Sequence, residues 1–318
     1  MLKLESVEAF AAIAASGSFT GAARRLAISK SVVSERLTEL ERALGAKLIQ
    51  RTTRRLSLTE GGAVFYERAK RILRDVELAA AELAERRGAL TGPLRISAPV
   101  SFGSLHLGPA LFGFLAKNPA IELTLELDDR FVDLPAEGYD AVVRHGPVSD
   151  KRVIAKRLAA SRRLLVASPD YLKRFGKPSS IEELKIHRGI IYSYRGQADW
   201  RFRVGRKLVT VTPGTALRVN NGLLMRDAAA AGLGIALLAT FLLEAPLRER
   251  TLKAIDIGAE AEGAMVYVAY PEHLRASAKI RALTAWLRGF FGDPAYWDNP
   301  RPSRAREPKP IEDIAANG

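Results

Sequence analysis

Between residues 29 and 42, hydroxyl and charged side chains recur at helical spacing, a pattern that suits hydrogen bonding to the edges of DNA bases. They lie on or beside the face opposite the apolar stripe of Val33 and Leu37 and are Ser29, Lys30, Ser31, Ser34, Glu35, Thr38 and Arg42. Lys30 can donate to guanine, and Glu35 can accept from N4 of cytosine. The same pattern is also typical of the solvated face of an ordinary helical hairpin. The neighbouring elements must decide between these interpretations.

The first 45 residues predict three short helices that would position this face. Apolar residues recur at helical spacing from Leu4 to Ala14, and Ser16-Gly17 stops that helix. Ser18 can cap a second helix over 19–26, and Ser29 can cap a third that ends at Gly45. Two short helices joined by a tight turn, the second of them amphipathic, form the helix-turn-helix pattern.

Residues 48–58 are predicted to form two short strands around a polar, basic tip, which together make a wing. The candidate contacts of the tip are Arg51, Thr53, Arg54 and Arg55. Residues 50–74 carry seven basic side chains against two acidic ones. Phosphate contacts need this kind of clustered positive charge, which does not depend on the base sequence. A basic wing beside the third helix therefore favours DNA binding over a solvated hairpin.

A long helix is predicted from Glu60, capped by Thr59, to about Arg87. Its apolar residues recur with a 3.5-residue period and are Phe65, Ala69, Ile72, Val76, Ala79 and Leu83. This seam predicts a homodimer, although a helix packed on its own domain is the alternative. A dimer would present two recognition helices to half-sites about one helical turn apart.

The composition excludes several classes of function. The formal charge of +14 and the pI of about 10.1 suit a polyanionic partner. The chain has no cysteine, which excludes disulfides, a thiolate nucleophile and zinc ribbons, and its four histidines are too scattered for a recognisable metal cluster. We therefore expect no cofactor.

The sequence predicts neither export nor membrane insertion. Glu5 and Glu8 lie where a signal peptide needs an apolar run, and the longest stretch without acidic, basic or histidine residues, residues 228–243, is too short to span a bilayer. The expected location is the cytoplasm, with no membrane partner.

After a boundary at Thr91-Gly92-Pro93, strand-like and helical segments alternate, which predicts a mainly parallel sheet covered on both faces. Strands are expected at 94–99, 121–127, 141–144, 153–158, 164–167, near 190 and 217, at 235–238 and at 265–270. Helices are expected at 107–117, near 171 and 181, at 221–231 and at 276–290. The last 26 residues lack apolar periodicity and are interpreted as a flexible tail. The predicted domains are thus 1–58, a linker helix over 59–91, an α/β domain over 92–292 and the tail 293–318.

In open α/β sheets, ligands bind beyond the carboxyl ends of the strands. The positions that meet this rule are Ser101, Phe102, Arg144, His145, Asn220, Asn221 and Thr240. Arg144 could instead pair with a structural carboxylate, and His145 could be a core histidine. Residues 151–174 hold eight basic side chains and one acidic one, Asp170. This basic segment either attracts an anionic ligand or forms a solvated face or dimer contact.

Several runs resemble the LysR-type transcriptional regulators. In the first domain they are FAAIAASGSFTGAARRL (10–26), ISKSVVS (28–34), LERALG (40–45) and LTEG (58–61). Further runs extend the resemblance to about residue 290 and are DAVVRHG (140–146), LVASP (165–169) and AGLGI (231–235). Lys30 and Glu35 depart from the residues common in the family, so the operator sequence should differ outside the shared core.

The resemblance implies an α/β protein overall: an all-α winged helix-turn-helix and a long linker helix, then a two-lobe α/β effector domain similar to periplasmic solute-binding proteins. It implies a regulator that binds double-stranded DNA and responds to a small-molecule effector at the strand ends named above. A homodimer that pairs into a homotetramer is expected, with RNA polymerase as a candidate partner.

Two other classes of protein share parts of this pattern. A transport-type solute-binding protein would need an export signal. An enzyme would need a motif such as Gly-x-Ser-x-Gly, a phosphate-binding loop or a metal site, none of which occurs in the sequence. The chain is therefore expected not to be an enzyme.

Overall fold

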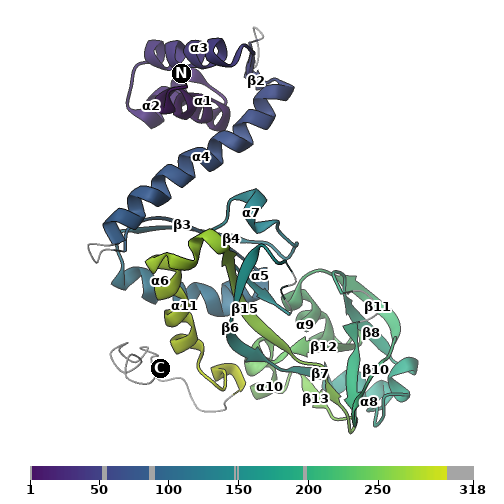
Figure 1. The fold of residues 1–318 in the computed structure, drawn as a ribbon. Coiled ribbons are helices and arrows are strands. Elements are labelled where there is room, and N and C mark those ends of the chain that lie inside the picture. Colours follow the sequence, from purple (N-terminus) through teal and green to yellow (C-terminus); the bar gives the residue numbers. More distant parts are fainter. Residues whose placement is uncertain are drawn as a thin grey trace, which may run out of the picture. The chain divides into compact units, whose positions relative to one another are not determined.

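The computed structural model describes residues 2–51, 56–85, 90–146, 148, 150–195 and 199–298. The chain divides into two compact units, Met1–Pro93 (the first unit) and Leu94–Gly318 (the second unit), and each is described by itself (Figure 1). Thr53, Arg54 and Arg55 of the predicted wing tip lie outside the described residues, as does the predicted tail from residue 299 onward.

The first unit contains the predicted helix-turn-helix, the two wing strands and the long helix. Its elements are α1 (Leu4–Ser16), α2 (Phe19–Leu26), α3 (Lys30–Leu44), β1 (Ile49–Arg51), β2 (Leu56–Leu58) and α4 (Glu60–Glu85). The predicted caps are confirmed: the hydroxyl of Ser18 accepts from the amide of Gly21 at 2.9 Å, and that of Ser29 accepts from Val32 at 3.3 Å. Gly45 ends α3 with a φ of 65°, a left-handed conformation that glycine adopts without strain.

The apolar seam predicted on the long helix is buried at its start and exposed further along. Ala69 is fully buried in the core of the first unit, and the ring of Phe65 lies 5.6 Å from that of Phe10. Further along α4, the side chains of Ile72, Val76 and Leu83 are 46%, 46% and 65% exposed. Packing on its own domain therefore accounts for the first two seam positions, while the later apolar positions remain exposed within this chain.

In the described residues, the second unit has two five-stranded sheets, each the centre of one lobe (Figure 1). The first lobe has strand order β4-β3-β5-β15-β6. Its elements are β3 (Gly92–Ala98), α5 (Val100–Phe102), the π-helical turn η1 (Gly103–Leu107), α6 (Gly108–Lys117), β4 (Ile121–Leu127), α7 (Leu134–Glu137), β5 (Ala141–His145), β6 (Val153–Ser161), β15 (Ala264–Pro271), η5 (Glu272–Ala276), α11 (Ala278–Phe291) and η6 (Tyr296–Asp298).

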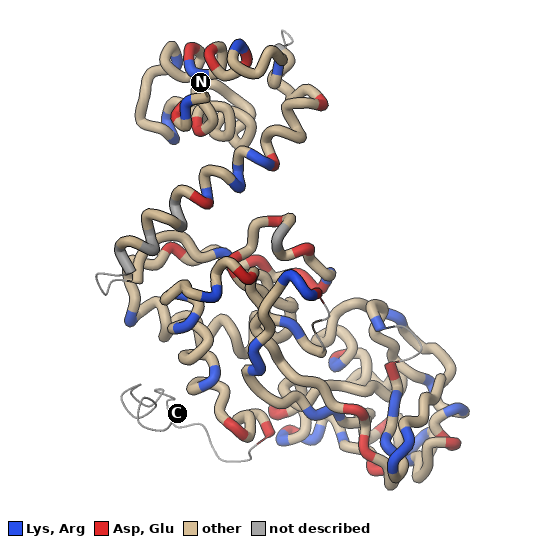
Figure 2. The backbone as a smooth tube through the Cα atoms, viewed as in Figure 1, with Lys and Arg blue, Asp and Glu red and all other residues tan. Residues whose placement is uncertain are grey.

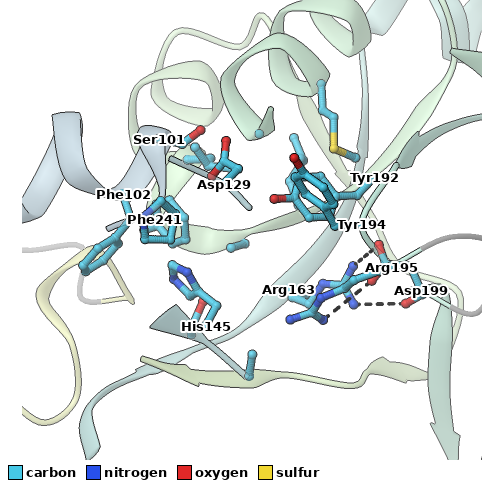
Figure 3. Close-up of a pocket in the computed structure, with 18 of the residues that line it drawn as sticks. Ser101, Phe102, Asp129, His145, Arg163, Tyr192, Tyr194, Arg195, Asp199 and Phe241 are labelled. Carbon is cyan, nitrogen blue, oxygen red and sulfur yellow. Dashed lines mark hydrogen bonds and ion pairs between the residues drawn. The ribbon is translucent and has the colours of Figure 1, made fainter. Parts of the chain in front are cut away.

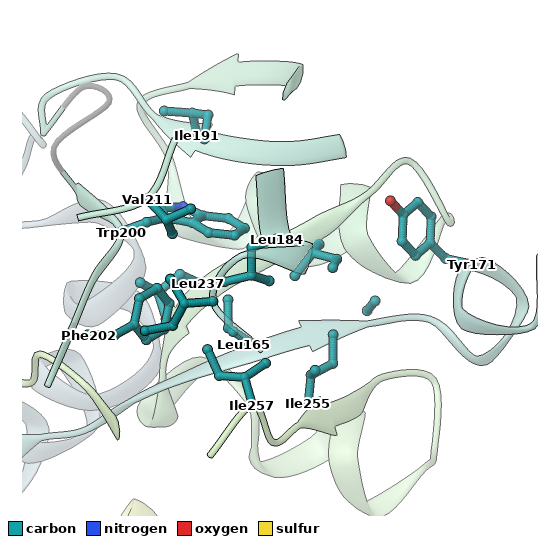
Figure 4. Packing of buried hydrophobic residues seen from close by; sticks show 13 residues of the cluster. Leu165, Tyr171, Leu184, Ile191, Trp200, Phe202, Val211, Leu237, Ile255 and Ile257 are labelled. Atoms are coloured by element: carbon teal, nitrogen blue, oxygen red, sulfur yellow. The ribbon is translucent and has the colours of Figure 1, made fainter. Parts of the chain in front are cut away.

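The second lobe has strand order β11-β8-β12-β7-β13 and a small three-stranded sheet, β10-β9-β14. Its elements are β7 (Arg163–Ala167), α8 (Pro169–Phe175), η2 (Glu183–Ile186), β8 (Arg188–Tyr192), β9 (Arg201–Val204), β10 (Lys207–Thr210), β11 (Gly214–Val219), α9 (Gly222–Ala230), β12 (Ile235–Ala239), η4 (Thr240–Leu242), α10 (Glu244–Arg248), β13 (Lys253–Ile255) and β14 (Glu260–Ala261). Its core joins Leu165 and Leu237 of the main sheet to Trp200 and Phe202 (Figure 4).

The prediction of a mainly parallel sheet is wrong, because both large sheets are mixed. Strand β3 runs parallel to β5, and β8 runs parallel to β11 and β12. In contrast, β15 is antiparallel to β5 and β6, and β7 is antiparallel to β12 and β13. The chain passes between the lobes along β6 to β7 and returns in β15. These strands are not joined to their neighbours by helical crossovers, so the rule that favours parallel pairing does not apply to them.

The predicted start of the flexible tail, at residue 293, is also wrong. Ala295 and Trp297 are buried, and the hydroxyl of Tyr296 makes a 2.6 Å hydrogen bond with Nδ1 of His106. Aromatic burial holds this segment against the second unit at least as far as residue 298. Sequence periodicity could not reveal it, since three residues of a 3-10 turn are too few to show a repeat.

The basic run at 151–174 is partly neutralised in the second unit, where Figure 2 shows acidic and basic residues interspersed. Arg152 forms ion pairs with Asp133 and Asp150, and Arg163 is buried against Asp199. The uniform positive field considered from the sequence is therefore reduced, because carboxylates distant in sequence face some of its members.

Candidate functional sites

The exposed face of α3 gathers the polar residues singled out from the sequence. Ser31, Glu35, Thr38 and Arg42 are exposed, and together with Ser34 and Glu39 they line one hollow on the surface. Ser29 and Lys30 are exposed at the start of the helix. Lys3 pairs with Glu39 at 3.2 Å, a contact that sequence reasoning missed because the partners are 36 residues apart. Glu35 has no such ion pair among the described residues, so its carboxylate is available to accept hydrogen bonds.

Glu41 connects α3 to the wing. Its side chain is buried, and its carboxylate accepts from the amides of Leu48 at 2.9 Å and Ile49 at 3.3 Å and from Nζ of Lys47 at 2.7 Å. Burial alone would raise the pKa of Glu41, but these hydrogen bonds hold it below its ordinary value. The charge therefore fixes the start of β1 against the end of α3. Of the predicted wing residues, Arg51 closes β1, and nothing further is described of its side chain.

A cavity of about 160 Å³ in the second unit is lined by residues of both lobes and is called here the interlobe cavity (Figure 3). This volume greatly exceeds what one water molecule needs. Four of the predicted ligand positions line it: Ser101, Phe102, Arg144 and His145. The rule about strand ends therefore predicted four residues of this cavity wall.

The other three predicted positions do not line the interlobe cavity. Asn221 caps α9, its side chain accepting from Leu224 at 3.0 Å, and Asn220 donates to the hydroxyl of Tyr194 at 3.4 Å. Thr240 is buried and donates to the backbone carbonyl of Arg162 at 3.3 Å. Their neighbours Gly222 and Phe241 face the cavity instead. A strand-end rule identifies a short segment, whereas the local turn decides which of its side chains points inward.

Arg144 is held by uncharged groups. Its guanidinium donates to the hydroxyl of Ser97 at 2.9 Å and to the carbonyls of Val143 at 2.9 Å and Arg130 at 3.3 Å. No carboxylate forms an ion pair with it in the part of the chain that the structure describes, so the structural pairing considered from the sequence is absent there. Burial lowers the pKa of Arg144, with the charges of Asp128 and Asp129 opposing that effect.

Sequence reasoning missed several polar residues of the cavity wall, which come from strand ends, strand starts and loops of both lobes. The missed polar lining residues are Asp129, Ser161, Arg163, Tyr192, Tyr194, Arg195 and Asp199. Within this group, Arg163 donates to the carboxylate of Asp199 at 2.7 Å, with side chains only 7% and 1% exposed. Asp129 accepts from the amide of Val100 at 3.1 Å, and burial raises its pKa. No short motif marks such residues, because they meet only through the packing of the two lobes.

His145 lies in an aromatic wall of the cavity. Its ring stacks on Phe241 at 4.9 Å and meets the edge of Phe102 at 5.1 Å. Its Nε2 atom has no hydrogen-bond partner among the described residues. Burial lowers the pKa of His145 from 6.5 to about 3, with a smaller contribution from the charge of Arg195. The imidazole is therefore neutral near pH 7.

This low pKa predicts a loss of stability in mild acid. Because the folded-state pKa of His145 is below that of the unfolded chain, the unfolded chain takes up the proton first as the pH falls below about 6.5. The free energy of unfolding should fall by about 1 kcal/mol between pH 7 and pH 5.5. Urea unfolding at a series of pH values measures this loss, and His145→Leu should remove most of it. The exposed His273→Leu serves as the control, and an equal flattening by both substitutions would contradict the prediction.

A wing and helix-turn-helix in one unit, together with a two-lobe unit that encloses a small-molecule cavity, define a ligand-responsive DNA-binding regulator. Comparisons with known proteins agree with this class. Residues 4–63 match the family described as "Bacterial regulatory helix-turn-helix protein, lysR family", and residues 87–292 match the "LysR substrate binding domain".

The matches to related proteins cover nearly the whole chain. An uncharacterised HTH-type transcriptional regulator of Haemophilus influenzae is 31% identical, over 89% of this chain and 99% of its own length. The structure of CrgA, a LysR-type transcriptional regulator from Neisseria meningitidis, is 28% identical with a TM-score of 0.57, over 89% of this chain and 97% of that one. Full-length AphB of Vibrio cholerae is 25% identical with a TM-score of 0.58, over 91% of this chain and 99% of that one.

The chain belongs to the LysR family of transcriptional regulators. It is accordingly a DNA-binding regulator with a domain that responds to a small molecule. No helix in the described part of the chain is both long enough and apolar enough to cross a membrane.

Proposed function

We propose that this regulator reads operator DNA with the exposed face of α3 and holds the phosphate backbone with its wing. The base-reading residues are Ser29, Lys30, Ser31, Ser34, Glu35 and Thr38, and the wing residues are Arg51, Thr53, Arg54 and Arg55. The observation that carries the proposal concerns α3. Its polar base-reading residues face outward, while the opposite face, with Val33 and Leu37, is buried in the first unit. An outward polar face next to a basic wing is what major-groove readout requires.

The test of this proposal is a change in sequence preference. Glu35→Ala should relax the preference for one base pair in each half-site, because the carboxylate would no longer accept from cytosine N4. We expect about a tenfold loss of discrimination at that position, from about 1–3 kcal/mol per specific contact. Selection from randomised duplexes, followed by fluorescence anisotropy on the selected sites, measures the effect. The exposed Glu8→Ala on α1 is the control. Equal losses on selected and random DNA would show that the reading face is elsewhere.

The proposed active species is a homodimer formed through α4, with two dimers forming a tetramer. Support comes from the exposed apolar positions Ile72, Val76 and Leu83, which continue the 3.5-residue seam beyond the part buried in the first unit. Two-fold pairing would present two α3 helices to half-sites about one helical turn apart.

The proposed role of the interlobe cavity is to bind an effector whose occupancy shifts the population of dimer or tetramer geometries. In this proposal the chain is not an enzyme, acts in the cytoplasm, and contacts RNA polymerase as a candidate partner. Four sequence-predicted positions on the cavity wall support the effector role: Ser101, Phe102, Arg144 and His145. Footprinting with and without candidate small acids, on the DNA upstream of its own gene and the divergent neighbour, tests it.

A further inference from the structure

The guanidinium of Arg195 lines the interlobe cavity with its hydrogen-bonding capacity unused. Its nearest carboxylate is Asp199, at an ion-pair distance of 3.6 Å, and in the described residues it makes no hydrogen bond through its side chain. Asp199 is already engaged, since its other oxygen accepts from Arg163 at 2.7 Å (Figure 3). Two arginines thus share one carboxylate, which leaves one positive charge in excess at this end of the cavity.

Two further cavity-lining groups lack partners near Arg195. The side chain of Ser161 is buried, with 2% of the residue exposed, and its hydroxyl has no hydrogen-bond partner among the described residues. The same holds for Nε2 of His145. A buried polar group without a partner costs about 1–3 kcal/mol, so each would gain from a ligand that supplies one.

These three groups come from connected parts of the cavity wall. Ser161 is two residues before Arg163, which shares Asp199 with Arg195. A Cβ atom at Gly146, next to His145, would lie only 3.3 Å from Nη2 of Arg195. The guanidinium of Arg195, from the second lobe, therefore reaches the end of β5 in the first lobe. A ligand bound here would contact both lobes.

The remaining wall determines what else the ligand must contain. Aromatic and aliphatic side chains form most of the rest of the cavity wall, among them Phe102, Tyr192, Met225, Leu237 and Phe241. Arg144 also lines it, and the negative charges of Asp128 and Asp129 act on its guanidinium. Asp129, whose carboxylate forms no ion pair with an arginine among the described residues, lies beside Ser101 and away from Arg195 in Figure 3. An anionic group at Arg195 therefore avoids this carboxylate, while an apolar part can occupy the aromatic side.

We propose that the effector is a small organic monocarboxylate with an apolar body, whose carboxylate is bound by Arg195 with Ser161 and His145 as additional hydrogen-bonding partners. The planar fork of an arginine matches a carboxylate in bidentate geometry. A single excess positive charge matches a monoanion, whereas a phosphate dianion would leave a charge uncompensated in a largely apolar cavity. This assignment rests on the proposed effector role of the cavity.

The test compares acids with their neutral, nearly isosteric amides. The full-length protein is titrated by calorimetry at pH 7.5 with benzoate and benzamide, phenylacetate and phenylacetamide, and butyrate and butyramide. We expect at least one acid to bind, and at least tenfold more tightly than its amide. Arg195→Gln should weaken binding of that acid at least tenfold, and Ser161→Ala should weaken it a few-fold. The matched control is Arg203→Gln, an exposed arginine of β9 in the same lobe, which should leave the affinity unchanged.

Binding of none of the acids at 10 mM, or equal binding of an acid and its amide, would overturn the assignment. So would an unchanged affinity in both Arg195→Gln and Ser161→Ala. The comparison of acid with amide uses the wild-type protein, so it remains decisive if a variant fails to fold. DNA binding is measured in parallel without acid. If the wild type binds specific DNA but none of the acids, the carboxylate proposal is rejected and the DNA-reading proposal stands. If the wild type shows no specific DNA binding, the DNA-reading proposal is rejected.

Discussion

Replacing Asp199 with asparagine should lower the free energy of unfolding of the second unit by about 3 kcal/mol. The side chains of Asp199 and Arg163 are 1% and 7% exposed, and Nη2 of Arg163 lies 2.7 Å from Oδ2 of Asp199. Arg163 also donates to the backbone carbonyl of Asp199 at 3.1 Å, so the arginine cannot leave without breaking two contacts. In the variant a buried positive charge remains with only a neutral amide beside it. Breaking a buried ion pair from one side is costly for this reason.

Urea denaturation followed by tryptophan fluorescence measures this loss, since Trp200 is buried next to Asp199 in sequence. The matched control is Asp227→Asn, which removes the partner of Arg226 from a 2.9 Å pair whose carboxylate side chain is 59% exposed. Solvent screens that pair, so its loss should cost less than about 1 kcal/mol. Equal losses in the two variants would mean that the Arg163–Asp199 pair is no more important than a surface contact.

The double substitution Arg54→Ala with Arg55→Ala should weaken DNA binding about 10- to 100-fold near 0.1 M salt, on specific and random sequences alike. These residues lie in the predicted basic wing tip, and phosphate contacts contribute affinity that does not depend on sequence. A variant that makes fewer phosphate contacts also releases fewer counterions when it binds DNA. The slope of log K against log salt should therefore become shallower by about 0.9 for each arginine.

Fluorescence anisotropy over a range of salt concentrations gives both the affinity and the slope. A charge-matched control is Arg203→Ala with Arg206→Ala, two exposed arginines of the second unit. It lowers the net charge by the same amount and should leave the slope nearly unchanged. A loss of affinity confined to the specific site would instead indicate that Arg54 and Arg55 contact base edges. An unaltered salt slope would show that they do not contact phosphates.

The elements of the first unit could be predicted because their signals are local. Ser18 and Ser29 cap their helices, Gly45 terminates α3, and the apolar stripe containing Val33 and Leu37 follows the helical repeat. Such signals depend on residues within a few positions of one another. The contact between Glu41 and the start of β1 was missed, because a carboxylate on a helix has the same local pattern whether it faces solvent or a buried strand.

In the second unit, the strands near 121–127 and 235–238 were predictable, whereas their directions were not. Whether β7 pairs antiparallel with β12 depends on where the chain passes between lobes, which no local pattern encodes. The packing of residues 295–297 was missed for a similar reason, since Tyr296 meets His106 across 190 positions.

The amino-acid order by itself thus determined the helix-turn-helix, its outward polar face and the alternation of strands and helices, because capping, periodicity and turn chemistry act over a few residues. Only the tertiary structure decided which side chains share the interlobe cavity. Arg195, Ser161 and His145 come from different strand ends and loops, and their charge and missing partners acquire meaning when the two lobes bring them to one place. Electrostatic and hydrogen-bond energies depend on distance in space, which separation along the chain does not reveal.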